Sequence, residues 1–336
     1  MYRRKRIRPA APEKPRGRRK GTGPNLFFLL LLSFSLFMIC AILGRSARTR
    51  RTYQQAAQLH ASYQDHPIEM TVFGPMATPV PVQENVPQAP ARPVLAETAE
   101  TMEPAQPDLA KQAQSQAGFS DAIPERFHLN SGTILGDMAA PYAQNPDLVA
   151  WLTIPGTLDL PILYRDNTYY LTHDFTGQSN SSGALFLDES HPLTSGTQNL
   201  LIHGHNMRDG TMFGRLTQYR SLPYLKAHPI FRFSTLYEEE EYAVFAVIRM
   251  PLDPADANFF NYYAYSRFHS LSDFSAFART VRGHSLYQIP VDLAPSDALL
   301  TLSTCLDTEH LLVMARRLRP GESADALSAQ VMSTRT

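Results

Sequence analysis

Cysteine is scarce in this chain, because only Cys40 and Cys305 occur among its 336 residues. Such a low count excludes a small fold held together by a framework of disulfide bonds. The chain also lacks a net charge, since 31 basic residues balance 31 acidic ones. With 43% hydrophobic residues, it is long and apolar enough to bury a sizeable core in one or two domains.

The zero net charge hides an uneven distribution. Up to Arg51 the chain has 14 basic residues and one acidic residue, whereas the remainder has 17 basic and 30 acidic residues. A nucleic-acid-binding protein would carry its basic surface on the folded part. The acidic body therefore argues against nucleic acid as a partner.

A stretch without any charged residue runs from Leu26 to Leu43. Its length of about 18 residues is sufficient for a helix to cross a bilayer. The run is longer than the apolar part of a signal peptide, and no small-x-small cleavage site follows it. Because most of the flanking basic residues precede the run, we expect a single-pass anchor with a cytoplasmic N-terminus and an extracellular body.

This topology makes the second cysteine informative. Cys40 falls within the expected span, where a thiol is a small apolar filler. Cys305 is then the only thiol of the exported part and has no partner for a disulfide in its own chain. Such a cysteine is either buried and inert or kept for its reactivity.

The organisation of the chain follows from shifts in composition. Residues 45–65 are polar and favour a short juxtamembrane helix, and nine prolines between Pro67 and Pro107 then predict a disordered spacer. Dense apolar patterning resumes near Phe119. The expected parts are a basic tail (1–24), a transmembrane helix (25–43), a juxtamembrane segment with spacer (44–118), a catalytic domain (119–320) and a C-terminal tail (321–336).

Short β-type runs dominate the folded part and are bounded by turn residues. They are 158–164, 183–187, 199–205, 230–234, 241–250, 298–305 and 310–318. Helical periodicity is clearest at 147–152 with its lead-in and at 271–282, where Ser272 is a candidate cap, and a further turn is expected at 212–219. Many strands and few helices predict a mainly β protein, with a closed or nearly closed barrel and peripheral helices.

Two of these runs end in residues that carry chemistry. Cys305 ends the last-but-one run, and His205 lies at the end of the run that begins at Asn199. A thiol can attack a carbonyl while an imidazole protonates the leaving amine, so the pair is typical of acyl transfer. An alternative is a zinc site formed by His203, His205 and Cys305, but no spacing for a fourth ligand is evident.

The segments around these residues resemble the signature segments of sortases, specifically class B. TLSTC ends at Cys305, and IHGHNMRDGTMFGRL contains His205. Three upstream segments, NPDLVAWLTIPGT, DNTYYLTHDF and SSGALFLD, resemble class B segments in the expected order. The similarity extends over roughly residues 145–318, which is nearly the whole folded part.

The resemblance implies a closed eight-stranded barrel and a cysteine transpeptidase of Gram-positive bacteria. Cys305 matches the nucleophile, His205 the proton donor and acceptor, and Asn167, Leu171 and Ser303 match positions that line the substrate groove. The implied partners are surface or pilin proteins that carry a C-terminal sorting motif, and an amine acceptor from a peptidoglycan precursor or a pilin lysine. No cofactor or metal is implied.

The chain departs from the family pattern after the nucleophile. Class B sortases carry an arginine at the start of the next strand, and His310 occupies that position here. Three interpretations are open: His310 donates a hydrogen bond in place of arginine, a remodelled loop brings another arginine, or the enzyme is impaired or specialised. A positively charged His310 would make activity fall with rising pH. The nearest arginines, Arg316 and Arg317, are expected to be surface charges.

Two other functions remain open at the level of sequence. An exported cysteine peptidase would use the same pair of residues with water as the acceptor. A catalytically inactive binding module would retain the groove without forming a thioester. The formation of an amide product in the presence of an amine distinguishes the transpeptidase from both.

Overall fold

The computed structural model describes residues 44, 46–61, 132–191 and 197–335. The expected membrane span and most of the expected spacer lie outside these ranges. Within the described ranges, no helix is both long and apolar enough to cross a bilayer. A compact unit begins at Thr49 and contains all the strands.

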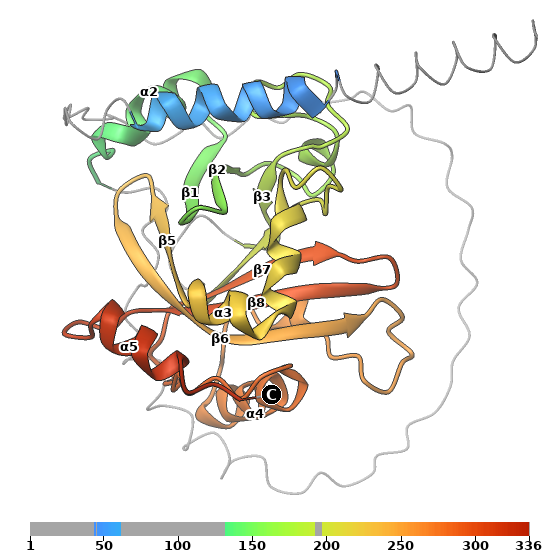
Figure 1. The fold of residues 1–336 in the computed structure, drawn as a ribbon, viewed down its shortest axis with the longest axis vertical. Coiled ribbons are helices and arrows are strands. Elements are labelled where there is room, and N and C mark those ends of the chain that lie inside the picture. Colours follow the sequence, from blue (N-terminus) through green and yellow to red (C-terminus); the bar gives the residue numbers. More distant parts are fainter. Residues whose placement is uncertain (1–43, 45, 62–131, 192–196, 336) are drawn as a thin grey trace, which may run out of the picture. The chain divides into compact units, whose positions relative to one another are not determined.

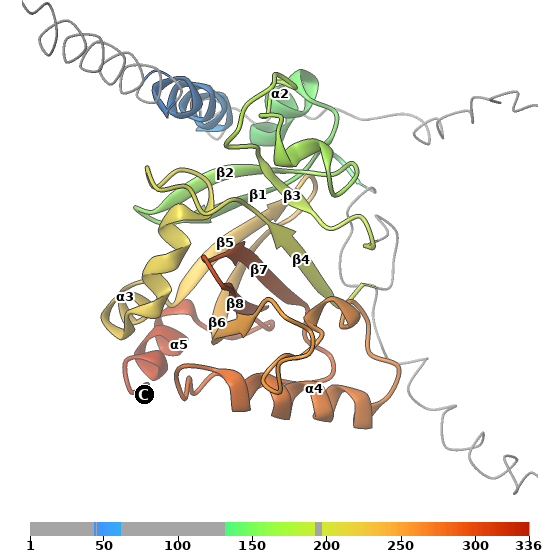
Figure 2. The same cartoon turned by 90° about the vertical axis from the view of Figure 1, so that its right-hand side faces the viewer.

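Eight strands close into a barrel in the order β1-β2-β3-β4-β7-β8-β6-β5. Figures 1 and 2 show these strands with the helices around them. Most neighbours are antiparallel, but β2–β3 and β4–β7 are parallel. The closed barrel with peripheral helices confirms the predicted fold class. The strands are β1 (Leu148–Ile154), β2 (Leu158–Leu163), β3 (Leu185–Leu187), β4 (Asn199–His203), β5 (Ile230–Thr235), β6 (Glu239–Pro251), β7 (Leu299–Cys305) and β8 (Glu309–Arg317).

One strand was not expected. The seven predicted runs coincide with β2 to β8, but β1 occupies residues that we predicted to be helical. Six of the seven residues of β1 are buried, so both faces of the strand are apolar and the alternation that marks a half-exposed strand is absent. The helical part of that prediction belongs to the lead-in, where α2 (Gly136–Gln144) forms.

The helices lie around the barrel. The predicted juxtamembrane helix is present over residues 46–61, and the hydroxyl of its Tyr53 donates to the carbonyl of Gly183 at 2.7 Å. The predicted helix at 271–282 is α4, whose cap is Ser270 rather than Ser272, since Ser270 Oγ accepts from the amide of Asp273. The other helical elements are η4 (Tyr169–Leu171), η5 (Phe213–Arg220), α3 (Leu222–Ala227), η6 (Tyr262–Ala264), α4 (Leu271–His284) and α5 (Ala324–Val331).

The C-terminal stretch that was expected to be a tail contains α5. Its Leu327 and Val331 are buried, and Ser323 caps the helix by accepting from the amide of Ala326. Burial of two large apolar side chains fixes the helix on the barrel. This segment is therefore part of the folded body.

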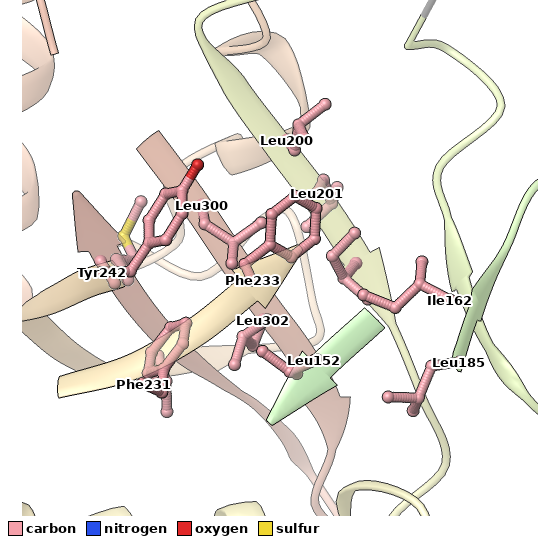
Figure 3. Packing of buried hydrophobic residues seen from close by; sticks show 14 of the residues in the cluster. Leu152, Ile162, Leu185, Leu200, Leu201, Phe231, Phe233, Tyr242, Leu300 and Leu302 are labelled. Carbon is pink, nitrogen blue, oxygen red and sulfur yellow. The ribbon is translucent and has the colours of Figure 1, made fainter. Parts of the chain in front are cut away.

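The barrel interior is filled by apolar side chains from opposite walls. Figure 3 shows Leu152 from β1, Ile162 from β2, Phe233 from β5 and Leu302 from β7 around a common centre. Because side chains alternate along a strand, residues 301, 303 and 305 of β7 face away from the side that carries Leu302. Cys305 therefore belongs to the outer face of the barrel.

That outer face is covered by the long connection between β6 and β7. The connection carries η6 and then α4, which lies across the lower part of the molecule in Figure 2. Three phenylalanines, Phe268, Phe274 and Phe277, pack against one another where this connection meets the barrel. The connection thus forms a fixed wall beside the C-terminal ends of β4 and β7.

Candidate active site

The thiol lies at one end of the barrel. Cys305 is the last residue of β7 and is exposed, whereas the six preceding residues of the strand are buried. The neighbouring parallel strand β4 ends at His203, which is paired in register with Ser303. The ends of the two strands therefore meet at one place, as the sequence analysis expected.

A hairpin fixes the position of His310 relative to this thiol. β7 and β8 are antiparallel neighbours, and Cys305 lies directly opposite His310. The turn between them is short and is closed by a bond from the amide of Leu306 to the carbonyl of Glu309. Side chains of directly opposite residues lie on the same face of a sheet. Sγ of Cys305 accordingly lies 3.7 Å from Nδ1 of His310.

His205 lies just beyond β4 and is fixed by main-chain contacts. The amide of Phe213 donates to its carbonyl at 3.0 Å, and the hydroxyl of Thr304 donates to the carbonyl of Gly204 at 2.7 Å. Nε2 of His205 lies 2.8 Å from the carbonyl oxygen of Leu171. Since a carbonyl only accepts, Nε2 must carry the proton in this contact.

Gly204 explains the spacing of the two histidines in this segment. A Cβ on Gly204 would overlap the side chains of Leu185 and Phe213. Only glycine therefore allows the chain to pass between β3 and η5 at this point. This close approach places His203 and His205 on the same pocket.

All seven residues that the sequence analysis named as candidate site residues, including the zinc candidate His203, line one pocket of about 290 Å³. Its walls also include residues that sequence reasoning missed, among them Asp188 and Tyr263. The full lining comprises Asn167, Leu171, Phe186, Asp188, His203, Gly204, His205, Tyr263, Ser303, Thr304, Cys305 and His310. A separate and larger pocket of about 350 Å³ is lined in part by Met212 and includes neither Cys305 nor any of the three histidines.

The two tyrosines of η6 form part of the wall. The hydroxyl of Tyr262 lies 3.2 Å from Oγ of Ser303 and donates to the hydroxyl of Tyr263 at 2.7 Å. The ring of Tyr262 meets the ring of His310 edge to face, with centroids 5.8 Å apart. The three tyrosines within residues 262–265 were the only sequence feature that could have indicated this wall. Their approach to β7 depends on how the long connection folds, which the sequence does not show.

A carboxylate and an imidazole pair at the base of the pocket. Nε2 of His203 lies 2.8 Å from Oδ2 of Asp188, which also accepts from the side-chain amide of Asn167. Burial opposes ionisation of Asp188, but hydrogen bonds from His203 and Ser190 hold the pKa of this carboxyl well below its usual value. The sequence analysis named His203 only as a candidate zinc ligand and did not reveal this contact with a carboxylate.

The environment keeps the thiol and His310 in their uncharged forms. Burial raises the pKa of the Cys305 thiol above its ordinary value. Burial, and then the charge of His203, lower the pKa of His310 below 6.5. His310 is consequently neutral at pH 7. This differs from the expectation of a cation in place of the family arginine.

No arginine is among the described residues that line the pocket. Arg316 is fully buried, and its guanidinium pairs with Glu322 at 2.6 Å and with Asp292 at 3.1 Å. The expectation that Arg316 is a surface charge is therefore wrong. The alternative of a zinc site gains no support, because no group of three potential ligands for a metal ion occurs in the described ranges.

Comparisons with known proteins agree with this fold. A family model described as the sortase domain matches residues 152–318. Sortase B of Listeria monocytogenes is 36% identical over 167 residues, which cover 49% of this chain and 65% of that protein. Sortase B of Staphylococcus aureus is 27% identical over 182 residues, covering 52% of this chain and 72% of that protein.

A solved structure gives the same result for the three-dimensional fold. A Bacillus anthracis protein described as similar to sortase B aligns with a TM-score of 0.51 and 25% identity. The alignment covers 64% of this chain and 99% of that chain. The chain therefore belongs to the sortase family, and its resemblance is to class B.

Proposed function

We propose that this chain is a sortase-type transpeptidase in which Cys305 is the nucleophile. The observation that carries the proposal is the exposed thiol at the end of β7, in a pocket that also contains three imidazoles and the end of β4. A thiol without a nearby acid or base would be a poor catalyst of amide cleavage. The family relationship supports the same reaction class.

The reaction has two halves. Sγ of Cys305 attacks the carbonyl carbon of a peptide bond, a thioester forms, the C–N bond breaks and the leaving amine gains a proton. An acceptor amine then attacks the thioester, loses a proton and forms a new amide, while the thiol regains its proton. His205 supplies the proton to the leaving amine and takes one from the acceptor amine.

The substrate side of the proposal rests on the pocket walls. Asn167, Leu171 and Ser303 lie beside Cys305 and form the surface for a C-terminal sorting motif of a surface or pilin protein. The acceptor is an amine of a peptidoglycan precursor or a pilin lysine. These partners are proposed from the family relationship and the size of the pocket.

The location is proposed from the sequence alone. The apolar run from Leu26 to Leu43, with basic residues mainly before it, supports a single-pass anchor with the catalytic domain outside the cell. Fractionation of cells that express the full chain should recover it with membranes. Protease added to intact cells without a wall should then digest the catalytic domain and spare the N-terminal tail.

The decisive experiment is the capture of the thioester. The full chain is incubated with a panel of synthetic sorting peptides, with and without triglycine as the amine probe, and analysed by mass spectrometry. We expect an adduct on the peptide containing Cys305 that hydroxylamine removes, and an amide product only when triglycine is present. Cys305→Ala should form neither, and His269→Gln, a change at an exposed histidine of the connection between β6 and β7, should form both.

Each contrary outcome would indicate a different function for this chain. Cleaved peptide in equal amounts with and without triglycine would identify a peptidase that uses water. Binding of the peptides without any adduct on Cys305 would identify an inactive binding module. Either result would overturn the proposed transfer reaction.

A further inference from the structure

The pocket contains one thiol and three imidazoles, and two of the imidazoles, those of His205 and His310, are held differently. His310 reaches Sγ of Cys305 with Nδ1 at 3.7 Å, which is within the range of a sulfur hydrogen bond. His205 instead has its Nε2 engaged with the carbonyl of Leu171. No hydrogen bond joins His205 to Cys305 among the contacts of the described residues.

From this geometry we propose that His310 is the catalytic base that takes the thiol proton of Cys305, and that His205 acts on the amines alone. The inference rests on the proposed role of Cys305 as nucleophile. It divides between two histidines the work that one histidine performs when it serves as both base and acid. His310 occupies the position of the family arginine, and the proposal gives this position a role in proton transfer.

The hairpin makes His310 suitable for this role. Its distance to the thiol is set by the register of β7 and β8, and the side chain is half-buried beside Tyr262. A base must lie within hydrogen-bond reach of the proton that it removes, and a base on a rigid element meets this condition before substrate binds. Nδ1 accepts the thiol proton when the ring carries its own proton on Nε2.

The protons balance over the two half-reactions. In the first, the Sγ–C bond forms as the thiol proton moves to Nδ1 of His310, and the C–N bond breaks as protonated His205 gives its proton to the leaving amine. In the second, the acceptor amine gives a proton to His205 as the new C–N bond forms. The Sγ–C bond then breaks, and His310 returns its proton to the sulfur of Cys305.

The surroundings of His310 favour a neutral ring in the resting enzyme. The charged or titratable groups that face it are Cys305 on β7, His203 on β4, the latter paired with Asp188, and Tyr262 and Tyr263 on η6. Burial, and then the electrostatic influence of His203, lower the pKa of His310. A neutral ring can accept a proton, whereas a protonated ring cannot.

The ion pair formed by Arg249 and Glu309 does not enter this site. Its two groups are 2.6 Å apart, and Arg249 lies opposite Leu311 in the pairing of β6 with β8. Leu311 and Glu309 alternate with His310 along β8, so they face the other side of the sheet. The local charge at His310 is therefore set by the pocket groups alone.

The test measures thiol reactivity with a probe that needs no sorting motif. The full chain is treated with iodoacetamide between pH 5 and 10, and carbamidomethylation of the peptide containing Cys305 is followed by mass spectrometry, which separates it from Cys40. We expect the wild-type rate to rise as the pH increases through the lowered pKa of His310, because the ring then loses its proton. The rate should reach a plateau near neutral pH. It should rise again at higher pH, where the thiol ionises without help from a base.

Three variants test which residue causes the first rise in the alkylation rate of Cys305. His310→Gln retains polar contacts but accepts no proton, so it should abolish the first rise, reduce the rate at pH 7 by about tenfold or more, and match the wild type near pH 10. His205→Gln should retain the first rise. His269→Gln, the exposed control, should match the wild type throughout.

The shape of the profile distinguishes proton transfer from a structural effect. A variant that only disturbed the hairpin would change the rate at pH 10 as well, and its melting temperature would fall. The inference is overturned if His310→Gln alkylates within twofold of the wild type at pH 7, or if His205→Gln abolishes the first rise. Because no peptide is involved, this outcome leaves thioester capture as a separate test of the proposed function.

Discussion

Nε2 of His203 lies 2.8 Å from Oδ2 of Asp188, and this pair forms the polar base of the pocket that contains Cys305. The carboxylate is nearly inaccessible to solvent, with 7% of its side chain exposed. The same oxygen, Oδ2, also accepts a hydrogen bond from the side-chain amide of Asn167. Asp188 therefore joins β4 to the segment before η4. The pair therefore stabilises the pocket wall as well as setting its charge.

We predict that Asp188→Asn lowers stability in a pH-dependent way. The folded state holds the pKa of Asp188 below its unfolded value, so the carboxylate contributes stability above about pH 4, and the contribution disappears as pH falls through the folded pKa. At pH 7 the variant should lose about 1–3 kcal/mol of unfolding free energy. Urea unfolding at pH 7 and pH 3 should show a smaller difference at pH 3.

The control for this prediction is Asp307→Asn, at an exposed position in the turn between β7 and β8. Its unfolding free energy should match the wild type within about 0.5 kcal/mol at both pH values. A deficit of Asp188→Asn that is equal at pH 7 and pH 3 would contradict the proposed ionic contribution.

Two adjacent arginines should respond very differently to the same change. Arg316 is fully buried among Asp292, Asp297 and Glu322, whereas Arg317 is 30% exposed and pairs with Glu240. Arg319 also pairs with all three carboxylates, so Arg316→Met removes the buried guanidinium and its charge-assisted hydrogen bonds without leaving the acids unpaired, and it should cost about 1.5–3 kcal/mol. Arg317→Met should cost about 1 kcal/mol or less. Similar urea midpoints for the two variants would show that the network contributes little.

Gly204→Ala should impair catalysis by moving His205. The added methyl would overlap Leu185 and Phe213, so the segment must shift. A displacement of about 1 Å at a catalytic group reduces rates by about a hundredfold, and we expect thioester formation to fall by that order. The measurement is the adduct on Cys305 with the peptide panel.

Gly283→Ala is the matched control, because a Cβ at Gly283 in α4 meets no atom within 4 Å. This change should raise stability by about 0.5–1 kcal/mol and leave thioester formation unchanged. If both glycine variants formed the thioester at the wild-type rate, the close approach at Gly204 would not position His205.

Met212 adopts a backbone conformation that favours glycine. Its φ is 48° and its ψ is −133°, although the side chain is buried. Met212→Gly and Met212→Ala both remove the buried side chain, but only glycine relieves the strain. We therefore expect the glycine variant to be more stable than the alanine variant by about 1 kcal/mol, as measured by urea unfolding. At an unstrained position alanine is usually more stable than glycine, so a more stable alanine variant would show that the backbone at Met212 is not strained.

The features that sequence analysis predicted are those encoded locally. Seven strands were recognised from short apolar runs with turn residues at their ends, and Cys305 was placed correctly at the end of such a run. β1 was missed because six of its seven residues are buried, and a uniformly apolar run of this length has no strand periodicity.

The features that were missed depend on contacts between distant segments. Tyr262 reaches Ser303 only because the long connection folds back over β7, and nothing near residue 262 in the sequence specifies that contact. Arg316 was taken for a surface charge because its acidic partners come from residues 292, 297 and 322. Charge state at the site was likewise unpredictable, since it depends on burial and on the approach of His203 to His310.

The tight turn between β7 and β8 has a consequence for damaged copies of the protein. Under the proposed role of His310, the two reacting atoms stay together only while the hairpin is paired, because they belong to different strands. Fraying at this end of the sheet would separate them before the rest of the barrel opened. A partly denatured molecule would then carry a thiol of ordinary, low reactivity. The pairing of β7 with β8 therefore limits acylation to molecules in which this end of the barrel is folded.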